Sequence, residues 1–323
     1  MRVAFVGKGG SGKTTLSALF ARHLASAGLP VLAVDADINQ HLGMTLGLEG
    51  ETPPPMGGHL ADVKEYFRGD NPRISSAAAM VKTTPPGRGS RLVRPCGDDP
   101  IHTRFTRATA EGVRLMVTGP FSEADLGVAC YHSKIGAVEI YLNHLVDEGG
   151  EYVVVDMTAG ADAFASGLFT RFDLTVLVAE PTRQGVSVYR QYAEYAADYD
   201  VAIAVVGNKV QNPTDLAFLR ENVGDDLLIH LDHSPAVRAM EQGRAFTMDD
   251  LEPTNRSALE TVRSAVDARP KDWGRFGRQT VEFHIRNARA WANLATGEDL
   301  VAQIDPEFTF GPADLCTSGA TTL

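Results

Sequence analysis

Short apolar runs alternate along the chain with segments whose apolar residues recur at helical spacing. The apolar runs cover residues 3–6, 31–35, 113–118, 152–156, 175–179 and 201–207. Consecutive apolar positions are typical of strands buried on both faces. The helical patterns cover residues 14–26, 135–147, 184–197 and 235–243. This alternation predicts an α/β fold, a mostly parallel β-sheet flanked by helices on both faces, with functional loops at the carboxyl ends of the strands.

Two regions interrupt the alternation. Residues 51–111 are rich in proline and glycine, and their later half in arginine, which predicts an insert that is loop in parts. After Pro253, residues 276, 280, 283, 287, 291 and 294 are mostly apolar and recur at helical spacing, which predicts a helix docked on the main domain. We therefore expect a main domain over residues 1–252 and a helical C-terminal extension over residues 253–323.

Composition and charge limit the classes of partner. The 323 residues carry a formal net charge of −11, which argues against general attraction to nucleic acid or to an anionic membrane. No apolar run approaches the roughly 18 residues of a membrane helix. The three cysteines are an odd number and do not suggest a disulfide framework. We expect a cytoplasmic protein with no nucleic-acid and no membrane partner.

A glycine-rich loop follows the first predicted strand and precedes the first predicted helix. Its residues 7–14, GKGGSGKT, match the phosphate-binding pattern G-x-x-x-x-G-K-[ST] in the context that this pattern requires. Such a loop points backbone N–H groups at phosphate oxygens beside the positive end of a helix dipole. Lys13 is expected to balance β- and γ-phosphate charge, and the Thr14 hydroxyl to ligate Mg²⁺. The other expected nucleotide contacts are Gly9, Gly10, Ser11, Gly12 and Thr15.

Three carboxylates and two further residues lie at or just after the ends of predicted strands. Asp35 and Asp37 close the second strand, where Asp35 would bind a Mg²⁺-bound water and Asp37 would orient or deprotonate the attacking water. Asp156 closes another strand and is expected in the outer Mg²⁺ shell. The amide of Gly160 could sense the γ-phosphate, and Asn208 could contact adenine. For each group the alternative is an ordinary turn at the end of a strand.

These motifs together carry a family resemblance. The segments KGGSGKTT (8–15), DAD (35–37) and DMTAG (156–160) resemble the deviant Walker A ATPases, the class of MinD, ParA and the nitrogenase iron protein. The resemblance covers about residues 1–250. It implies that Lys8 reaches across a twofold interface to the phosphates bound by the other subunit. ATP would then hold a homodimer together, and hydrolysis would loosen it.

A second segment resembles one branch of that class. Residues 127–134, GVACYHSK, are similar to the G-x-G-C-x-C-P-E stretch of the carbon monoxide dehydrogenase maturation ATPases of the CooC type, which bind metal between two subunits. Here Cys130 is present, but His132 replaces the second cysteine. Two copies of this pair would offer two sulfur and two nitrogen ligands, a set suited to Zn²⁺ and accepted by Ni²⁺. Alternatively, Cys130 is a small buried hydrophobe and His132 a surface group.

The sequence thus favours a Mg²⁺-dependent ATPase that dimerises on ATP and switches an unidentified client protein during metal-centre maturation. A non-metal regulatory or positioning switch, with the same ATP chemistry, is the alternative. A small-molecule kinase is a third hypothesis, but it leaves the pair Lys8 and Lys13 unexplained.

Overall fold

A central β-sheet organises the molecule. The computed structural model describes residues 1–48, 50, 52–120, 131–158, 164 and 167–314. Within these residues the sheet has eight strands in the order β3-β4-β2-β5-β1-β6-β7-β8. The strands are β1 (Arg2–Gly7), β2 (Val31–Ala36), β3 (Thr106–Ala108), β4 (Arg114–Val117), β5 (Tyr152–Met157), β6 (Leu174–Ala179), β7 (Ile203–Gly207) and β8 (Leu227–His230). All neighbouring pairs are parallel except β3 with β4.

The six strands predicted from the sequence are confirmed, with shifted ends. Every residue of β1, β2, β5 and β6 is buried, as expected for strands covered on both faces. Strands β3 and β8 were not predicted. β3 has three residues, and β8 is half-buried at the edge of the sheet, so neither forms a long apolar run. The confirmed α/β class places the carboxyl ends of seven parallel strands at one edge of the sheet.

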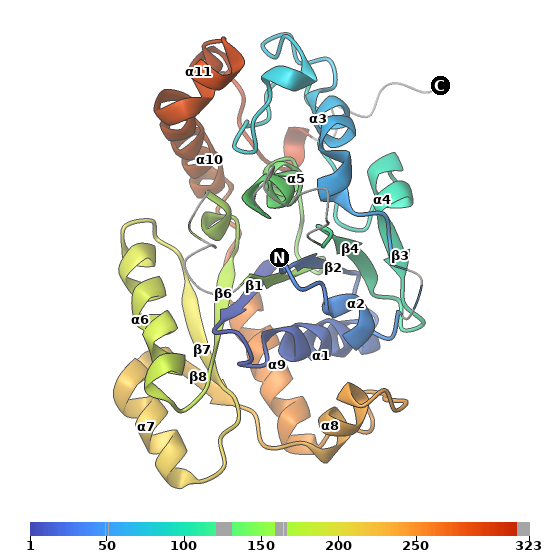
Figure 1. The fold of residues 1–323 in the computed structure, drawn as a ribbon, viewed down its shortest axis with the longest axis vertical. Helices are drawn as coiled ribbons and strands as arrows, with labels where there is room; N and C mark the ends of the chain where they lie inside the picture. Colours follow the sequence, from blue (N-terminus) through green and yellow to red (C-terminus); the bar gives the residue numbers. More distant parts are fainter. Residues whose placement is uncertain (49, 51, 121–130, 159–163, 165–166, 315–323) are drawn as a thin grey trace.

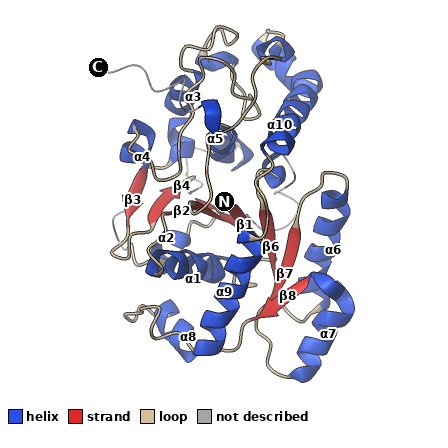
Figure 2. Ribbon diagram, turned by 180° about the vertical axis from the view of Figure 1, so that it is seen from behind, coloured by secondary structure: helices blue, strands red, loops and turns tan. Residues whose placement is uncertain are grey.

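Helices cover both faces of the sheet (Figures 1 and 2). One face carries α1 (Lys13–Ser26), α2 (Leu42–Thr45), α8 (Pro235–Glu241) and α9 (Pro253–Asp267). The other carries α3 (Leu60–Arg68), α4 (Pro100–Phe105), α5 (Tyr131–Asn143), α6 (Arg183–Ala197), α7 (Pro213–Val223) and α10 (Trp273–Asn287). Alternate residues of β1 enter the two cores: Val3 and Phe5 join one, and Ala4 and Val6 join the other.

The helix predicted over residues 135–147 was wrong at both ends. α5 begins at Tyr131 and ends at Asn143. Beyond it, Leu145 forms a parallel bridge with Val93, and the Val146 N–H donates to the Val93 carbonyl at 2.8 Å. Pairing with a segment some 50 residues earlier therefore replaces the last turn of the expected helix.

The insert and the C-terminal region pack more closely than the sequence suggested. Residues 51–111 contain α3, α4 and β3, and buried side chains such as Met56 and Phe67 join the core. In the C-terminal region, α9 and α10 lie on opposite faces of the sheet (Figure 1). The division at residue 252 stays a prediction.

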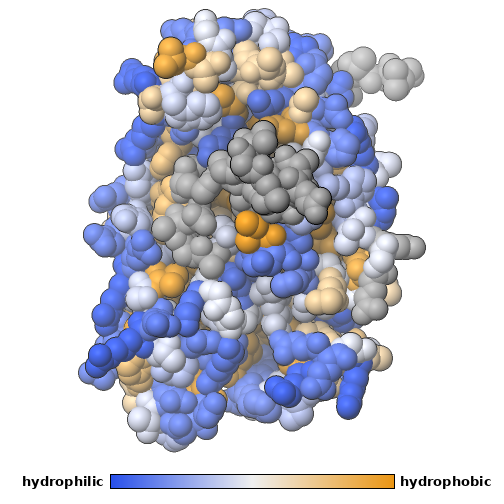
Figure 3. Space-filling view, viewed as in Figure 1, coloured by the Kyte–Doolittle hydropathy of each residue, from blue (hydrophilic) through white to orange (hydrophobic). Residues whose placement is uncertain are grey.

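The predicted apolar stripe on the C-terminal helix is only half docked. Phe276 and Phe283 are buried, whereas Trp291 is 47% exposed and Leu294 is 92% exposed. A π-helical segment, Ala288–Ala292, joins α10 to α11 (Asn293–Thr296) and shifts the register, so that Ala288 and Ala292 face inward instead. In Figure 3, apolar side chains gather at the upper end of the molecule, where α11 lies in the same view of Figure 1. The lower half of the face shown is mostly hydrophilic. No described helix has the length and apolar character needed to cross a bilayer.

Candidate nucleotide-binding site

The glycine-rich loop connects β1 to α1 with the backbone that its sequence requires. Gly10 and Gly12 have φ angles of 81° and 97°, in the left-handed region that favours glycine. A Cβ on Gly12 would lie 2.2 Å from the Asn208 amide nitrogen, so a side chain there would collide with its neighbour. α1 has no acidic residue in its first turn, which leaves the helix terminus suited to an anion.

Lys13 is the cation of this loop. It is buried, 6% exposed, and its Nζ lies 3.4 Å from Asp37 Oδ2. Asp37 is held from its other side by Asn39, whose backbone N–H donates to Asp37 Oδ1 at 3.0 Å. The structure thus brings together the predicted phosphate-binding lysine and the predicted water-positioning carboxylate.

Asp35 and Asp156 form a buried pair of carboxylates at the same edge of the sheet. They are register partners on β2 and β5, and neither is exposed. Burial, and then the negative charge of Asp156, raises the pKa of Asp35 to about 8. Burial raises the pKa of Asp156 to about 6, although hydrogen bonding to Thr14 and the charge of Lys13 oppose this. The Thr14 hydroxyl donates to Asp156 Oδ2 at 2.6 Å.

This group of oxygens has the chemistry of a divalent-cation site. Two carboxylates and a hydroxyl are hard oxygen ligands, the kind that Mg²⁺ takes together with water and substrate phosphate. Burial is the main cause of both raised pKa values, and a bound cation would favour the charged form of these carboxyl groups. The predicted residues Thr14, Asp35 and Asp156 therefore fit a bound Mg²⁺.

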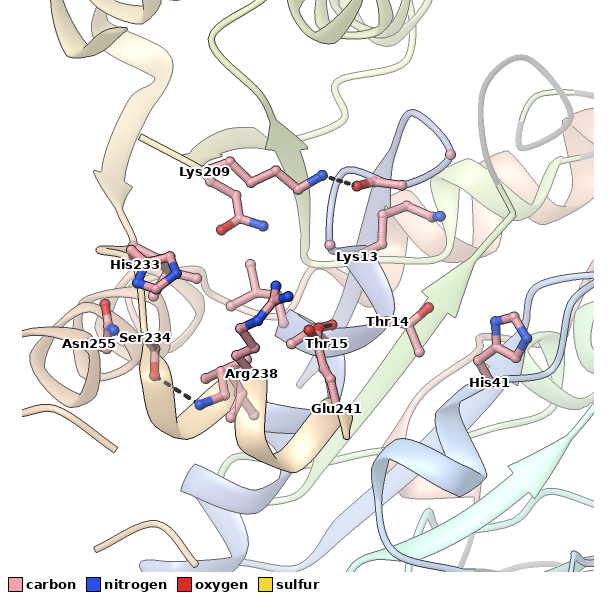
Figure 4. A pocket seen from close by; sticks show the side chains of 18 of the residues that line it. Lys13, Thr14, Thr15, His41, Lys209, His233, Ser234, Arg238, Glu241 and Asn255 are labelled. Atoms are coloured by element: carbon pink, nitrogen blue, oxygen red, sulfur yellow. Dashed lines mark hydrogen bonds between the residues drawn. The ribbon is translucent and has the colours of Figure 1, made fainter. Parts of the chain in front are cut away.

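A cavity of about 850 Å³ extends from the loop toward α8 and α9. Gly9, Gly10, Gly12, Lys13, Thr14 and Thr15 line its end at the glycine-rich loop, and their contact with a nucleotide stays a prediction. Figure 4 shows that the other end is formed by the segment after β8 and by α8, including His233, Ser234 and Arg238. Glu241 of α8 accepts a hydrogen bond from the Thr15 hydroxyl at 2.8 Å, which connects α8 to α1. The cavity has the size of a small-molecule site.

Asn208 and Lys209 bring the end of β7 onto the loop. Asn208 Nδ2 donates to the Ser11 carbonyl at 2.7 Å. Lys209 Nζ donates to the Gly10 carbonyl at 2.6 Å (Figure 4). Asn208 lines the cavity, and its contact with adenine stays a prediction. Lys209, Arg238 and Glu241 were not predicted. Lys209 directly follows Asn208 at a strand end, which was the available signal, whereas nothing local marks α8 as part of the site.

Three predicted residues lie outside or at the margin of the described structure. Gly160 and Cys130 are outside the described residues, and the side chain of His132, in the first turn of α5, is not described either. Among the residues that are described, no group of three or more His, Cys, Asp or Glu side chains could hold a metal ion. The Cys130–His132 metal site stays a prediction.

Lys8 differs from Lys13 in its surroundings. It is half-buried, and within the described part of the chain its side chain has neither a hydrogen bond nor an ion pair. Gly9 and Gly10, which follow it, are exposed. Lys13 points into the cavity, but the charge of Lys8 is not compensated by any described residue of its own chain.

The fold and the site define a P-loop nucleotide-binding protein, with two buried carboxylates and a lysine converging on one glycine-rich loop. The chain matches the model of the CobQ/CobB/MinD/ParA nucleotide binding domain over residues 3–265, and it belongs to that family. It is therefore an ATP hydrolase of the deviant Walker A type, as its sequence predicted.

Two relatives match most of the chain. The carbon monoxide dehydrogenase accessory protein CooC of Rhodospirillum rubrum is 27% identical over 277 residues, which cover 82% of this chain and 96% of CooC. An uncharacterized ATP-binding protein of Methanocaldococcus jannaschii is 28% identical over 228 residues, covering 70% of this chain and 81% of that protein. The predicted resemblance to the CooC type is thereby confirmed.

Solved structures share the fold. MinD in the MinC:MinD cell division protein complex of Aquifex aeolicus superposes with a TM-score of 0.55 at 19% identity, covering 84% of this chain and 97% of that chain. A ParA family ATPase from Chlorobium tepidum gives a TM-score of 0.51 at 16% identity, covering 87% of this chain and 96% of that chain.

Proposed function

We propose that this ATPase is Mg²⁺-dependent, forms a homodimer when ATP binds, and uses hydrolysis to switch a client protein during metal-centre maturation. The observation that carries the dimer is Lys8, whose charge has no partner in its own chain among the described residues. The relative that supports the metal-centre role is the carbon monoxide dehydrogenase accessory protein, matched over 96% of its length. A cytoplasmic location stays a prediction.

The chain's own residues account for phosphate binding. Backbone N–H groups of the loop and the first turn of α1 face the phosphates, and Lys13 supplies a buried positive charge. Thr14, Asp35 and Asp156 would hold Mg²⁺, which when bound neutralises phosphate charge. A bound triphosphate then competes with Asp37 for Lys13, because both anions seek the same ammonium group.

Asp37 is the residue positioned to act on water. Once Lys13 turns to the phosphates, the Asp37 carboxylate can accept a proton from a water molecule. The water oxygen bonds to the γ-phosphorus, and the bond from that phosphorus to the β–γ bridging oxygen breaks. ADP leaves with the bond's electron pair, inorganic phosphate is released, and the proton passes through Asp37 to solvent. Lys8 of a second copy would add positive charge where negative charge accumulates in the transition state.

The dimer is tested by sedimentation velocity with ATP or ADP. We expect the wild type to dimerise with ATP and to be monomeric with ADP. Lys8→Ala should keep ADP affinity within about threefold, yet lower ATP-driven dimerisation and hydrolysis by about tenfold or more. Lys64→Ala, on α3 outside the cavity, is the matched control. Normal ATP-driven dimerisation of Lys8→Ala would contradict the proposed role.

The metal-centre role is tested separately by elemental analysis of the reduced protein. We expect one Zn²⁺ or Ni²⁺ per dimer in the ATP-bound state, lost in both Cys130→Ser and His132→Ala. If the wild type dimerises on ATP but holds no such metal, the alternative applies, a regulatory switch without a metal centre. The metal content of the ATP-bound dimer distinguishes these outcomes, because two copies of the Cys130–His132 pair are needed for four ligands.

A further inference from the structure

Gln40 adopts an uncommon backbone conformation just beyond the catalytic carboxylates. Its φ angle is 46°, and it is one of three non-glycine residues with positive φ among those described. A left-handed conformation is unfavourable for a residue with a long side chain, so the surroundings of Gln40 must hold it in place. Strained residues of this kind cluster at functional sites, which makes the contacts of Gln40 informative.

The side-chain amide of Gln40 connects two parts of the fold. Its Nε2 donates to the Asp37 carbonyl and lies 3.3 Å from Asp35 Oδ1. Its Oε1 accepts from the Gly119 N–H at 3.0 Å. The orientation of the amide is determined, because a backbone carbonyl can only accept and a backbone N–H can only donate. One side chain therefore joins the end of β2 to the segment that follows β4.

Gln40 lies next to the nucleotide cavity without lining it. Its neighbours Ile38, Asn39 and His41 line the cavity, but Gln40 does not. It is half-buried, and its contacts are with the backbone and the carboxylate of the acidic strand end. A change in Gln40 should therefore alter how Asp35 and Asp37 are held without removing a nucleotide contact.

Gly119, which donates its N–H to Gln40, has little conformational freedom. Gly119 has a φ of 105°, and a Cβ there would lie 2.4 Å from the Pro55 Cβ. The preceding Thr118 N–H donates to the Asp35 carbonyl at 2.9 Å. Because the end of β4 is confined between β2 and Pro55, a displacement of the acidic strand end must be accommodated at Gly119.

We infer that Gln40 is a positioning residue that couples the Asp35–Asp37 segment to the end of β4, so that the nucleotide state alters the hydrogen bond to the Gly119 N–H. The chain continues from Gly119 to Cys130 and His132, the residues proposed to bind a metal between two copies of the chain. This inference rests on the proposed function and gives it a route from hydrolysis to the metal-binding segment.

Two substitutions separate the two ends of the connection. Gln40→Glu keeps an acceptor for Gly119 but places a negative charge against Asp35 and the Asp37 carbonyl. Gln40→Met has a side chain of similar length but loses the hydrogen bonds at both ends, to the acidic segment and to the Gly119 N–H. We expect kcat for ATP hydrolysis to fall about tenfold or more in both variants, with KM and ADP affinity within about threefold of wild type. Gln242→Met, at an exposed glutamine after α8, is the matched control.

Hydrogen exchange of the peptide covering residues 114–120 supplies the second measurement. In the wild type, exchange at Gly119 should differ between a non-hydrolysable ATP analogue and ADP. Gln40→Met should abolish this difference with fast exchange in both states, and Gln40→Glu should keep protection in both.

Two results would overturn the inference: wild-type kcat and a wild-type exchange difference in both variants, or an equal loss of ADP affinity and thermal stability in both. The second would show that Gln40 is merely structural. A wild type that binds ATP without hydrolysing it would instead remove the proposed function, while the exchange difference at Gly119 would still support the coupling.

Discussion

The two ends of the central strands each carry a buried group of charges, but the groups are balanced differently. At the amino ends, Arg2 Nε lies 2.7 Å from Asp147 Oδ1, and Lys271 Nζ lies 2.5 Å from Asp147 and 2.6 Å from Asp173. At the carboxyl ends, Asp35, Asp37 and Asp156 are buried, and the ion pair between Lys13 Nζ and Asp37 Oδ2 measures 3.4 Å.

The pKa values follow this difference in balance. Burial alone would raise the pKa of Asp147, but the charges of Arg2 and Lys271 lower it well below its ordinary value. Asp35, by contrast, has its pKa raised to about 8 by burial and by Asp156. In the amino-end cluster, nearby cations favour the charged form of Asp147. At the carboxyl ends, burial and the neighbouring carboxylate disfavour the charged form of Asp35, and a bound cation would favour it. We therefore expect the first cluster to contribute mainly to folding stability, and the second to the proposed nucleotide and metal binding.

Removing a cation from the amino-end cluster should produce the largest effect, and it should act on stability. Lys271→Met leaves Asp147 and Asp173 buried with less compensation, so we expect the free energy of unfolding to fall by about 3–5 kcal/mol. Denaturant unfolding measures this, and ATP affinity of the folded protein should stay unchanged. Arg263→Met removes a partly exposed cation that pairs with Glu260 and Asp267 on the surface of α9, and should cost less than about 1 kcal/mol. Equal costs for the two variants would invalidate the comparison.

Removing the cation of the carboxyl-end group should act on binding instead. Lys13→Ala should lower the affinity for ATP and ADP by about a hundredfold, because a buried ammonium no longer meets the phosphates. Isothermal titration measures the affinity, with Lys8→Ala as the neighbouring control. A loss of folding stability as large as that of Lys271→Met would show that the two clusters do the same work.

The smallest expected effect is the contribution of Asp35 to the pH dependence of folding stability in the ligand-free protein. Its raised pKa means that the folded protein holds this proton more tightly than the unfolded chain, so this carboxyl makes stability fall as pH rises. From pH 6 to pH 8 its contribution should decline by about 2 kcal/mol, and Asp35→Asn should remove that decline. Denaturant unfolding at both pH values, with exposed Asp225→Asn as control, measures the difference. Identical pH dependence in wild type and Asp35→Asn would show that Asp35 is already compensated.

The parts of the molecule that could be predicted from sequence are those encoded locally. The loop at residues 7–14 and the buried strands are each marked by contiguous residues, so their positions could be predicted. The convergence of Lys13, Asp37 and Asp156 then followed from the ends of these strands. Long-range pairing was not visible in this way. The end of α5 depends on Val93, and Asp173, one partner of Lys271, lies 98 residues earlier in the chain.

The far end of the cavity illustrates the same limit. Arg238 and Glu241 stand on a short helix of seven residues that carries no nucleotide motif. They reach the site because α8 packs beside α1, where Thr15 meets Glu241. Gln40 lies only three residues after Asp37. Its role nevertheless depends on its backbone conformation and on a hydrogen bond to Gly119, 79 positions later. Neither could be inferred without the fold.

The helical run from α10 to α11 has a spectroscopic consequence. Both tryptophans of the chain belong to it. Trp273 packs against Phe310 with ring centroids 5.1 Å apart, while Trp291 is half exposed beyond the start of the π-helical segment. The intrinsic tryptophan fluorescence of the unlabelled protein therefore originates from this one element, and we expect the more exposed Trp291 to emit at the longer wavelength. Quenching by acrylamide would report on its tip directly, with no dye attached.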